Sequence, residues 1–145
     1  MRVANTNLNY MATGTFCGTV IGVVANGAHE TNGAVAIYTA VGPYSFNVSI
    51  GSSSVSVTGG SMTIDGASLT FSGSGAIIGT TPTEYTATMS GSRSGSSLSG
   101  SIRGAFLGNP ADSSSVPRNS AGSFNAHNSG VTYQISGVHF SQVSP

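Results

Sequence analysis

The fold is decided by the stretch Gly95-Ser-Ser-Leu-Ser-Gly-Ser-Ile-Arg-Gly-Ala-Phe-Leu-Gly-Asn-Pro-Ala-Asp112. Apolar residues and glycines share one parity in its central part, while serines and an arginine share the other. Successive side chains of a β-strand point to opposite faces, so this alternation predicts a strand with one buried face. The residues expected to face the core are Leu98, Gly100, Ile102, Gly104 and Phe106.

Several further segments alternate in the same way, and helical periodicity is almost missing from the chain. Extended segments are expected at 13–24, 34–41, 44–50, 55–58, 61–64, 69–73, 85–89, 98–106, around 124 and at 131–135. Some of them join into longer strands, so about eight strands result. The pair Gly42-Pro43 is expected to break the chain, and Gly59-Gly60 marks either a bulge or a turn. The sequence therefore predicts an all-β fold, a single antiparallel barrel with a sandwich as the alternative. Glycines on the apolar parity favour the barrel, because they let strands bend sharply: Gly100, Gly104 and Gly137.

Composition limits the domain count and the kinds of partner. A chain of 145 residues fits one domain, expected at 13–145, preceded by an arm or first strand at 1–12. Charged residues make up only 6% of the chain, the formal net charge is zero, and lysine is absent. The scattered arginines form no basic stripe, so nucleic acid is not an expected partner.

The redox and targeting signals are sparse. The single cysteine, Cys17, has no internal disulfide partner and is expected to pack in the first strand. Residues 1–7 lack the apolar run of a secretory signal, and no segment approaches the ~20 apolar residues of a transmembrane helix. The strands also look short for a lipid-facing barrel. Either the protein is made without export, or the sequence is a piece of a longer exported chain. Low charge and abundant Gly, Ser, Thr and Asn suit an extracellular or cell-surface location.

One motif carries a family resemblance. Gly100-Ser-Ile-Arg-Gly-Ala-Phe-Leu-Gly-Asn-Pro-Ala111, followed by Gly122-Ser-Phe124, resembles the final strands of the transferrin-binding-protein-B-like barrel family. That family has a Gly-rich strand ending in Gly-x-Phe-Tyr/Phe-Gly-Pro-x-Ala-x-Glu and then Gly-Gly-x-Phe. Here Asn109-Pro110 reverses the usual Pro-Asn order, and residues 112–121 replace the acidic residue and the second glycine. The resemblance extends from about Thr13 to Phe140.

The resemblance implies a barrel without enzymatic activity. Members of this family are modules of bacterial surface lipoproteins, of binders of host proteins or haem, and of the C-terminal parts of larger exported proteins. No lipidated cysteine stands at the start of this chain. We therefore expect a binding or structural module. The resemblance does not identify its ligand.

The residues themselves give no catalytic, metal or cofactor pattern. Serines are abundant, but no Gly-x-Ser-x-Gly stands between a strand and a helix. The three histidines match no metal-ligand spacing and are expected to be solvated in loops, and the four acidic residues lie in four separate segments near turns. We expect no enzyme, no metal site and no cofactor. The histidines are His29, His127 and His139.

The loops are the expected binding elements of such a barrel. Candidates are the connections at 25–33, 79–84 and 109–120. The longest carries a mixture of residues suited to contact with a protein or a small ligand. The candidate contact residues are Asp112, Val116, Pro117 and Arg118, with His29 and Glu30 in the first loop.

The alternative is a structural subunit that self-associates, such as a component of an extracellular filament or a virion coat. Low charge reduces repulsion between copies. In residues 1–12, asparagines alternate with Thr6, Leu8 and Tyr10. Such a segment could add as a strand to the sheet edge of a neighbouring subunit. Leu8 and Tyr10 are the residues expected to anchor this arm.

Overall fold

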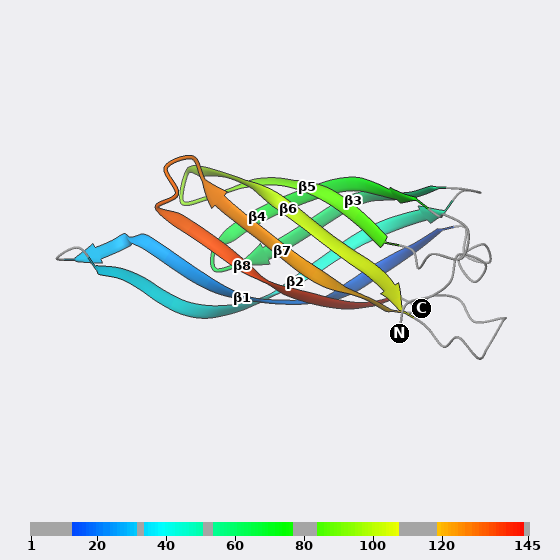
Figure 1. The fold of residues 1–145 in the computed structure, drawn as a ribbon, viewed down its shortest axis with the longest axis horizontal. Helices are drawn as coiled ribbons and strands as arrows, with labels where there is room; N and C mark the ends of the chain where they lie inside the picture. Colours follow the sequence, from blue (N-terminus) through cyan, green and yellow to red (C-terminus); the bar gives the residue numbers. More distant parts are fainter. Residues whose placement is uncertain (1–12, 32–33, 51–53, 77–83, 108–118, 144–145) are drawn as a thin grey trace.

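The chain folds into a closed antiparallel β-barrel of eight strands, as the alternation predicts. A computed structural model describes residues 13–31, 34–50, 54–76, 84–107 and 119–143 (Figure 1). The strands are β1 (Thr13–Thr31), β2 (Ala34–Ile50), β3 (Ser54–Ile64), β4 (Ala67–Ala76), β5 (Glu84–Arg93), β6 (Ser96–Leu107), β7 (Asn119–Asn128) and β8 (Tyr133–Val143).

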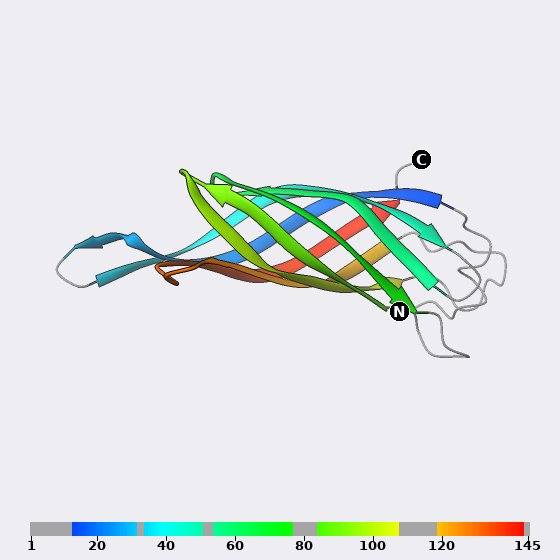
Figure 2. The same cartoon turned by 90° about the horizontal axis from the view of Figure 1, so that it is seen from above.

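Each strand pairs with the next in the sequence, and β8 returns to pair with β1. Closure along that seam runs from Phe16 opposite Val143 to Asn26 opposite Tyr133. The strands cross the long axis of the molecule obliquely, as strands of a closed barrel must (Figures 1 and 2). Closure leaves the barrel wall without a free edge along its paired length.

Aromatic rings from opposite walls meet inside the barrel. Phe16 of β1 stacks on Phe46 of β2 with 5.2 Å between ring centroids. Phe106 of β6 lies 5.5 Å from Phe16, and Tyr85 of β5 lies 5.4 Å from Phe106 and 5.5 Å from Phe46. All four side chains are buried. The interior here is therefore a packed core, as expected for eight strands, which enclose little more than their own side chains.

The predicted register of β6 is confirmed. Leu98, Ile102 and Phe106 are buried, whereas the serines between them are exposed. Gly104 lies beneath the ring of Tyr85: a Cβ at this position would be 2.6 Å from the phenolic oxygen. The absent side chain thus makes room for the largest buried residue of the core.

The expected break at Gly42-Pro43 is wrong, because β2 runs without interruption from Ala34 to Ile50. Proline lacks the N–H that a central strand would donate. Pro43 lies opposite Thr19 of β1, and pairing with β3 begins only at the next residue, Tyr44. Pro43 therefore occupies an edge position, where proline is tolerated.

Two further turn signals are resolved by the structure. Gly59-Gly60 forms a bulge within β3, with the register against β4 shifting between Val57 and Gly60 and a φ of 59° at Gly59. Val131, expected in the last strand, instead lies in the turn before β8 with a φ of 52° and an exposed side chain. The last strand runs on to Val143.

The loop expected at 25–33 is also wrong. β1 continues to Thr31 and β2 begins at Ala34, so the two strands form a long hairpin. β1 pairs with β8 only as far as Asn26, and β2 pairs with β3 only from Tyr44. The outer part of the hairpin therefore extends beyond the barrel (Figures 1 and 2).

The two ends of the barrel differ in their connections. At the end that carries the hairpin, the turns at Asp65-Gly66, Ser94-Gly95 and 129–132 join neighbouring strands closely. At the opposite end, residues 51–53, 77–83 and 108–118 join the strands and lie outside the described residues. The first residue of β1 and the last of β8 are also at that opposite end (Figure 1).

Candidate functional site

Most of the outer wall is covered by short hydroxyl side chains. On β3 to β6 the outward positions are almost all serine and threonine, and the alternation of buried and exposed residues is regular. These side chains are small and neutral, so they offer water hydrogen bonds but little apolar contact area.

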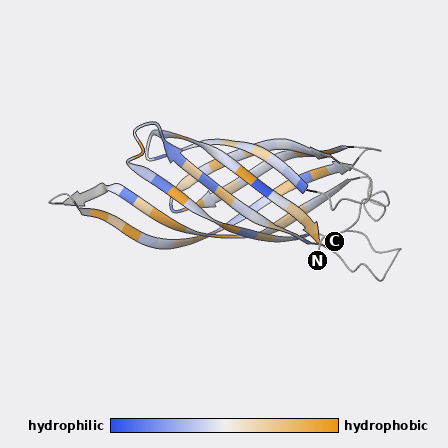
Figure 3. Ribbon diagram, viewed as in Figure 1, coloured by the Kyte–Doolittle hydropathy of each residue, from blue (hydrophilic) through white to orange (hydrophobic). Residues whose placement is uncertain are grey.

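The outer face of β8, β1 and β2 is different, because large aliphatic and aromatic side chains are exposed there. Ile21 of β1 lies between Val41 of β2 and Val138 of β8 in one cross-strand row. Their exposed fractions are 51%, 64% and 59%. Figure 3 shows separate bands of apolar colour along β1 and β2 of the hairpin, between paler and bluer bands. We call this the apolar outer surface; its residues are Ile21, Val23, Val35, Ile37, Val41, Val138 and Phe140.

The size of this surface is unusual for an isolated chain. Seven large apolar side chains, between 48% and 71% exposed, together offer on the order of 700 Å², against the 300–600 Å² of the largest patch on a typical monomer. None of the outward side chains described on these three strands is charged. A hollow of about 300 Å³ between β1 and β8 adjoins the surface and is lined in part by Ile21, Val138 and Phe140.

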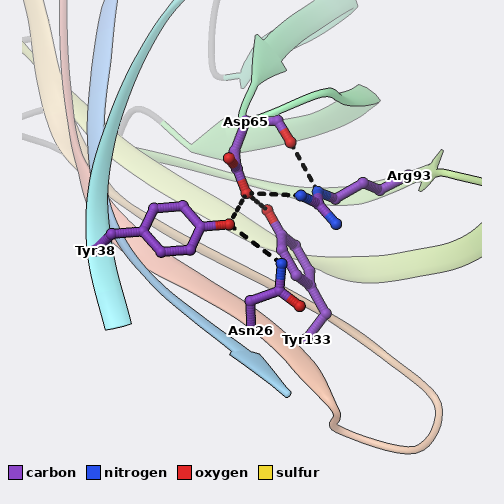
Figure 4. A network of polar contacts seen from close by, with 5 residues as sticks. All are labelled: Asn26, Tyr38, Asp65, Arg93 and Tyr133. Carbon is purple, nitrogen blue, oxygen red and sulfur yellow. Dashed lines mark hydrogen bonds and ion pairs between the residues drawn. The ribbon is translucent and has the colours of Figure 1, made fainter. Parts of the chain in front are cut away.

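A polar network closes the barrel at the hairpin end (Figure 4). The carboxylate of Asp65, in the β3–β4 turn, accepts hydrogen bonds on Oδ2 from the hydroxyls of Tyr38 (2.8 Å) and Tyr133 (2.7 Å). Asn26 Nδ2 donates to the Tyr38 hydroxyl over 3.2 Å. Arg93 Nη2 lies 3.4 Å from the same carboxylate oxygen, and Arg93 Nε donates to the Asp65 carbonyl over 2.7 Å. We call this set the Asp65 network.

The network joins five strands or their turns around one carboxylate. The guanidinium of Arg93 also lies over the ring of Tyr133, 4.5 Å from its centroid, so the cation interacts with the aromatic face. Burial, reinforced by the hydrogen bond and charge of Asp65, raises the pKa of Tyr133, and its hydroxyl stays a donor. Oδ2 of Asp65 accepts from two phenols and an arginine at once, which favours a structural role over acid–base chemistry.

A second polar chain lies inside the barrel. His139 Nε2 is 2.8 Å from the carbonyl oxygen of Arg103, and Nδ1 is 2.9 Å from the hydroxyl of Tyr44. A carbonyl only accepts, so Nε2 carries the proton, and the Tyr44 hydroxyl donates to Nδ1 of the neutral ring. Burial lowers the pKa of His139, against the opposing effect of its hydrogen bond to the Arg103 carbonyl.

The tyrosines beside this histidine are buried as well. Burial raises the pKa of Tyr44. Burial also raises the pKa of Tyr85 to about 12, a rise that its hydrogen bond with Ser120 (3.0 Å) partly offsets. Both phenols are therefore protonated and neutral over the whole physiological pH range.

The histidines differ from the solvated loop residues that the sequence predicts. His139 is buried on the inward face of β8, and His127 is half-buried on β7, its Nδ1 3.0 Å from the carbonyl oxygen of Asn128. His29 and Glu30 fall within β1 rather than in a loop, but their side chains lie outside the described residues. Within the described part of the chain, no group of three or more His, Cys, Asp or Glu residues could hold a metal ion.

The other predicted contact residues lie outside the described residues, so the structure does not place them. They are Asp112, Val116, Pro117, Arg118, Leu8 and Tyr10.

Cys17 is not a core residue, contrary to expectation. It lies in β1 between the inward-facing positions 16 and 18, so its side chain points outward and is exposed. The described residues contain no helix that is long and apolar enough to span a membrane.

Sequence reasoning missed both the apolar outer surface and the Asp65 network. A signal for the surface was present in Val20-Ile-Gly-Val-Val24, where apolar residues occupy both parities and so predict a strand with two apolar faces. The network had no comparable signal, because its members lie in five segments that only closure of the barrel brings together.

Comparison of the chain with protein-family models, with curated proteins and with solved structures finds no match. The resemblance to the transferrin-binding-protein-B-like barrels therefore stays a prediction from the motif of β6 and β7.

Proposed function

We propose that this protein is a non-enzymatic barrel module of the extracellular space or the cell surface, which binds a protein partner through its apolar outer surface. The observation that carries the proposal is the contrast on the barrel wall. Seven large apolar side chains gather on β8, β1 and β2, whereas the rest of the wall is mostly serine and threonine. Contiguous apolar surface of this extent is a common mark of a protein interface.

The interior supports the same assignment. Rings from opposite walls are in contact at the centre of the barrel, so a ligand would have to displace the core. The ionisable groups of the two polar clusters are engaged: Asp65 with two phenols and an arginine, and His139 with a phenol and a carbonyl. Binding is therefore expected on the outside of the barrel. A module of the transferrin-binding-protein-B-like kind would fit this arrangement.

The test is selective retention of a partner from extracts and culture medium of the source cells. The wild-type barrel and the double variant Ile21→Ser/Val138→Ser are immobilised in parallel. The variant removes two apolar side chains from the centre of the apolar outer surface and leaves the buried core unchanged. Thr70→Ala/Thr88→Ala on the exposed faces of β4 and β5 is the matched control. We expect wild type and control to retain the same protein and the surface variant to lose it. Equal retention by all three barrels would overturn the proposal.

A self-assembling structural subunit is the second candidate. The observation that favours it is the outer part of β2, which among the described strands has a partner on one side only. Deleting residues 1–12 tests the version in which Leu8 and Tyr10 anchor a donated arm, and light scattering gives the mass. An assembly that survives the deletion unchanged would reject the arm.

A further inference from the structure

We propose that the partner seated on the free edge of β2 is a second copy of this chain, joined by antiparallel pairing of the segment Val35–Val41 with itself. The inference rests on the proposed function in that both use the outer hairpin. It concerns a backbone edge rather than the centre of the apolar outer surface, so the two can fail separately.

The first argument is the state of the edge. β2 pairs with β1 along its length, but among the described residues its pairing with β3 covers only Tyr44 to Ile50. The backbone groups of Val35–Val41 on the side away from β1 therefore have no strand partner among the described residues. An extended strand edge of this kind is a template for a further strand.

The second argument is the absence of protection. Proteins usually guard a free edge with a charged side chain, a proline or a bulge. Val35–Val41 contains no charged residue and no proline, and its register against β1 is regular from Ala36 to Val41. The shift in register against β1 falls between Ala36 and Ala34, at the outer end of the segment. Pro43, the nearest proline, stands outside the segment. The most exposed large apolar residue of the described chain, Ile37 at 71%, lies in its middle.

The third argument is self-complementarity. In a two-fold symmetric antiparallel pair centred on Tyr38, Val35 faces Val41 of the second copy and Ile37 faces Thr39 of the second copy. All four side chains point outward, so these pairs share one face of the joined sheet. The segment is uncharged and the chain has zero formal net charge, so the copies meet without electrostatic repulsion.

The predicted anchors of the arm, Leu8 and Tyr10, cannot reach this edge in their own molecule. Thr13 is opposite Ser49, and Val41 is eight residues further along β2, about 26 Å at the rise of a strand. Leu8 lies five residues before Thr13 and can extend at most about 18 Å from it. A Leu8 or Tyr10 seated on this edge would therefore belong to another molecule.

The experiment measures the mass in solution by sedimentation velocity up to about 1 mM protein. All variants carry Cys17→Ser, because Cys17 is exposed and could form an unrelated disulfide. We expect a reversible dimer with twice the 14.4 kDa mass of the chain. Val35→Lys and Val41→Glu should each weaken it at least about tenfold, because a charge then faces an apolar side chain of the second copy.

The double variant Val35→Lys/Val41→Glu fixes the register. In the proposed pair the introduced ammonium faces the introduced carboxylate of the second copy twice, so the dimer should return and become sensitive to salt. In one molecule the two positions are six residues apart on the same strand, too far for direct contact. Thermal denaturation of each variant establishes that the barrel is folded.

Val138→Lys is the matched control, since it adds the same charge to the same outer face but on β8, two strands from the edge. It should leave the dimer intact while weakening the binding assigned to the apolar outer surface. A chain that stays monomeric, a dimer lost in Val138→Lys but not in Val35→Lys, or a double variant that stays monomeric would each overturn the proposal. Loss of partner retention in Ile21→Ser/Val138→Ser with an intact dimer supports both proposals.

Discussion

At the scale of single residues, Asp65 is the most connected polar side chain of the barrel. It has a φ of 52°, a left-handed conformation that asparagine and aspartate adopt more readily than other residues. The same residue thus shapes the β3–β4 turn and supplies the carboxylate that binds Tyr38, Tyr133 and Arg93. These two roles can be separated by substitution.

We expect Asp65→Asn to keep the turn and remove the charge, lowering the free energy of unfolding by about 1.5–3 kcal/mol. The loss arises because Arg93 and the two phenols would share a weaker, neutral acceptor. Urea denaturation measures it. Ser94→Asn is the control, because Ser94 has a φ of 49° in the equivalent β5–β6 turn and is exposed. Equal stability of the two variants would contradict a stabilising network.

His139 makes the stability depend on pH. Burial lowers its pKa below the ordinary value of 6.5, so the folded barrel favours the neutral ring. The stabilisation is fully present above the unfolded pKa and is lost as the pH falls below about 6.5, by at most about 1.4 kcal/mol per pH unit. The denaturation midpoint of the wild type should fall as the pH is lowered from about 7.5 to about 6.0 and then to about 5.0, the range in which histidine titrates.

The variant His139→Gln should be less stable at neutral pH but lack this slope between about pH 6.5 and 5. Its amide can still donate to the Arg103 carbonyl, so the barrel has a route to fold. The neighbours Tyr44 and Tyr85 remain protonated throughout, since burial raises the pKa of both. A slope identical to that of wild type would assign the pH dependence to another group.

At the scale of strands, period-two alternation was sufficient to predict the faces of β6 from Ser97 to Gly104, where Leu98 and Ile102 are buried and each serine is exposed. It failed at Pro43, which is tolerated because the pairing of β2 with β3 goes no further than Tyr44. How far this pairing extends depends on β3, not on the sequence around Pro43. The position of Val131 similarly depends on Asn128, whose Oδ1 accepts from the backbone N–H of Thr132 and fixes the turn.

The register of β6 gives a direct test. Phe106→Ala should cost about 3–5 kcal/mol in the free energy of unfolding, because the ring is fully buried between Phe16 and Tyr85. Ser101→Ala, on the outward face of the same strand, should change the stability by less than about 0.5 kcal/mol. Comparable losses from both substitutions would mean that the strand is turned the other way.

At the scale of the whole molecule, the closed topology joins the most distant parts of the sequence. Seven hairpin pairings connect neighbours, whereas the seam brings Phe16 beside Val143. Closing such a long loop costs more entropy than forming a hairpin, so the seam is expected to form late in folding. The sequence alone predicted a barrel but not which polar groups meet at its end, because only closure places Asp65, Arg93 and Tyr133 together.

Refolding should therefore take milliseconds to seconds, the range of folds dominated by distant contacts. Ile135→Ala on β8 should mainly accelerate unfolding, whereas Leu69→Ala on β4 should mainly slow refolding. Both side chains are buried, so the losses of stability are comparable. Stopped-flow fluorescence in urea separates the two rates, and a slowed refolding of Ile135→Ala would show that the seam forms early.

The positions of the arginines have a practical consequence for protease experiments. The chain has no lysine, so trypsin can cleave only after its four arginines. Of the two that the structure describes, Arg93 is held by Asp65 at the end of β5, and Arg103 lies in the middle of β6, hydrogen-bonded between two strands. A protease needs its substrate strand detached from the sheet. Cleavage after Arg103 therefore requires opening of the barrel itself, so the rate of tryptic cleavage at this site measures global unfolding.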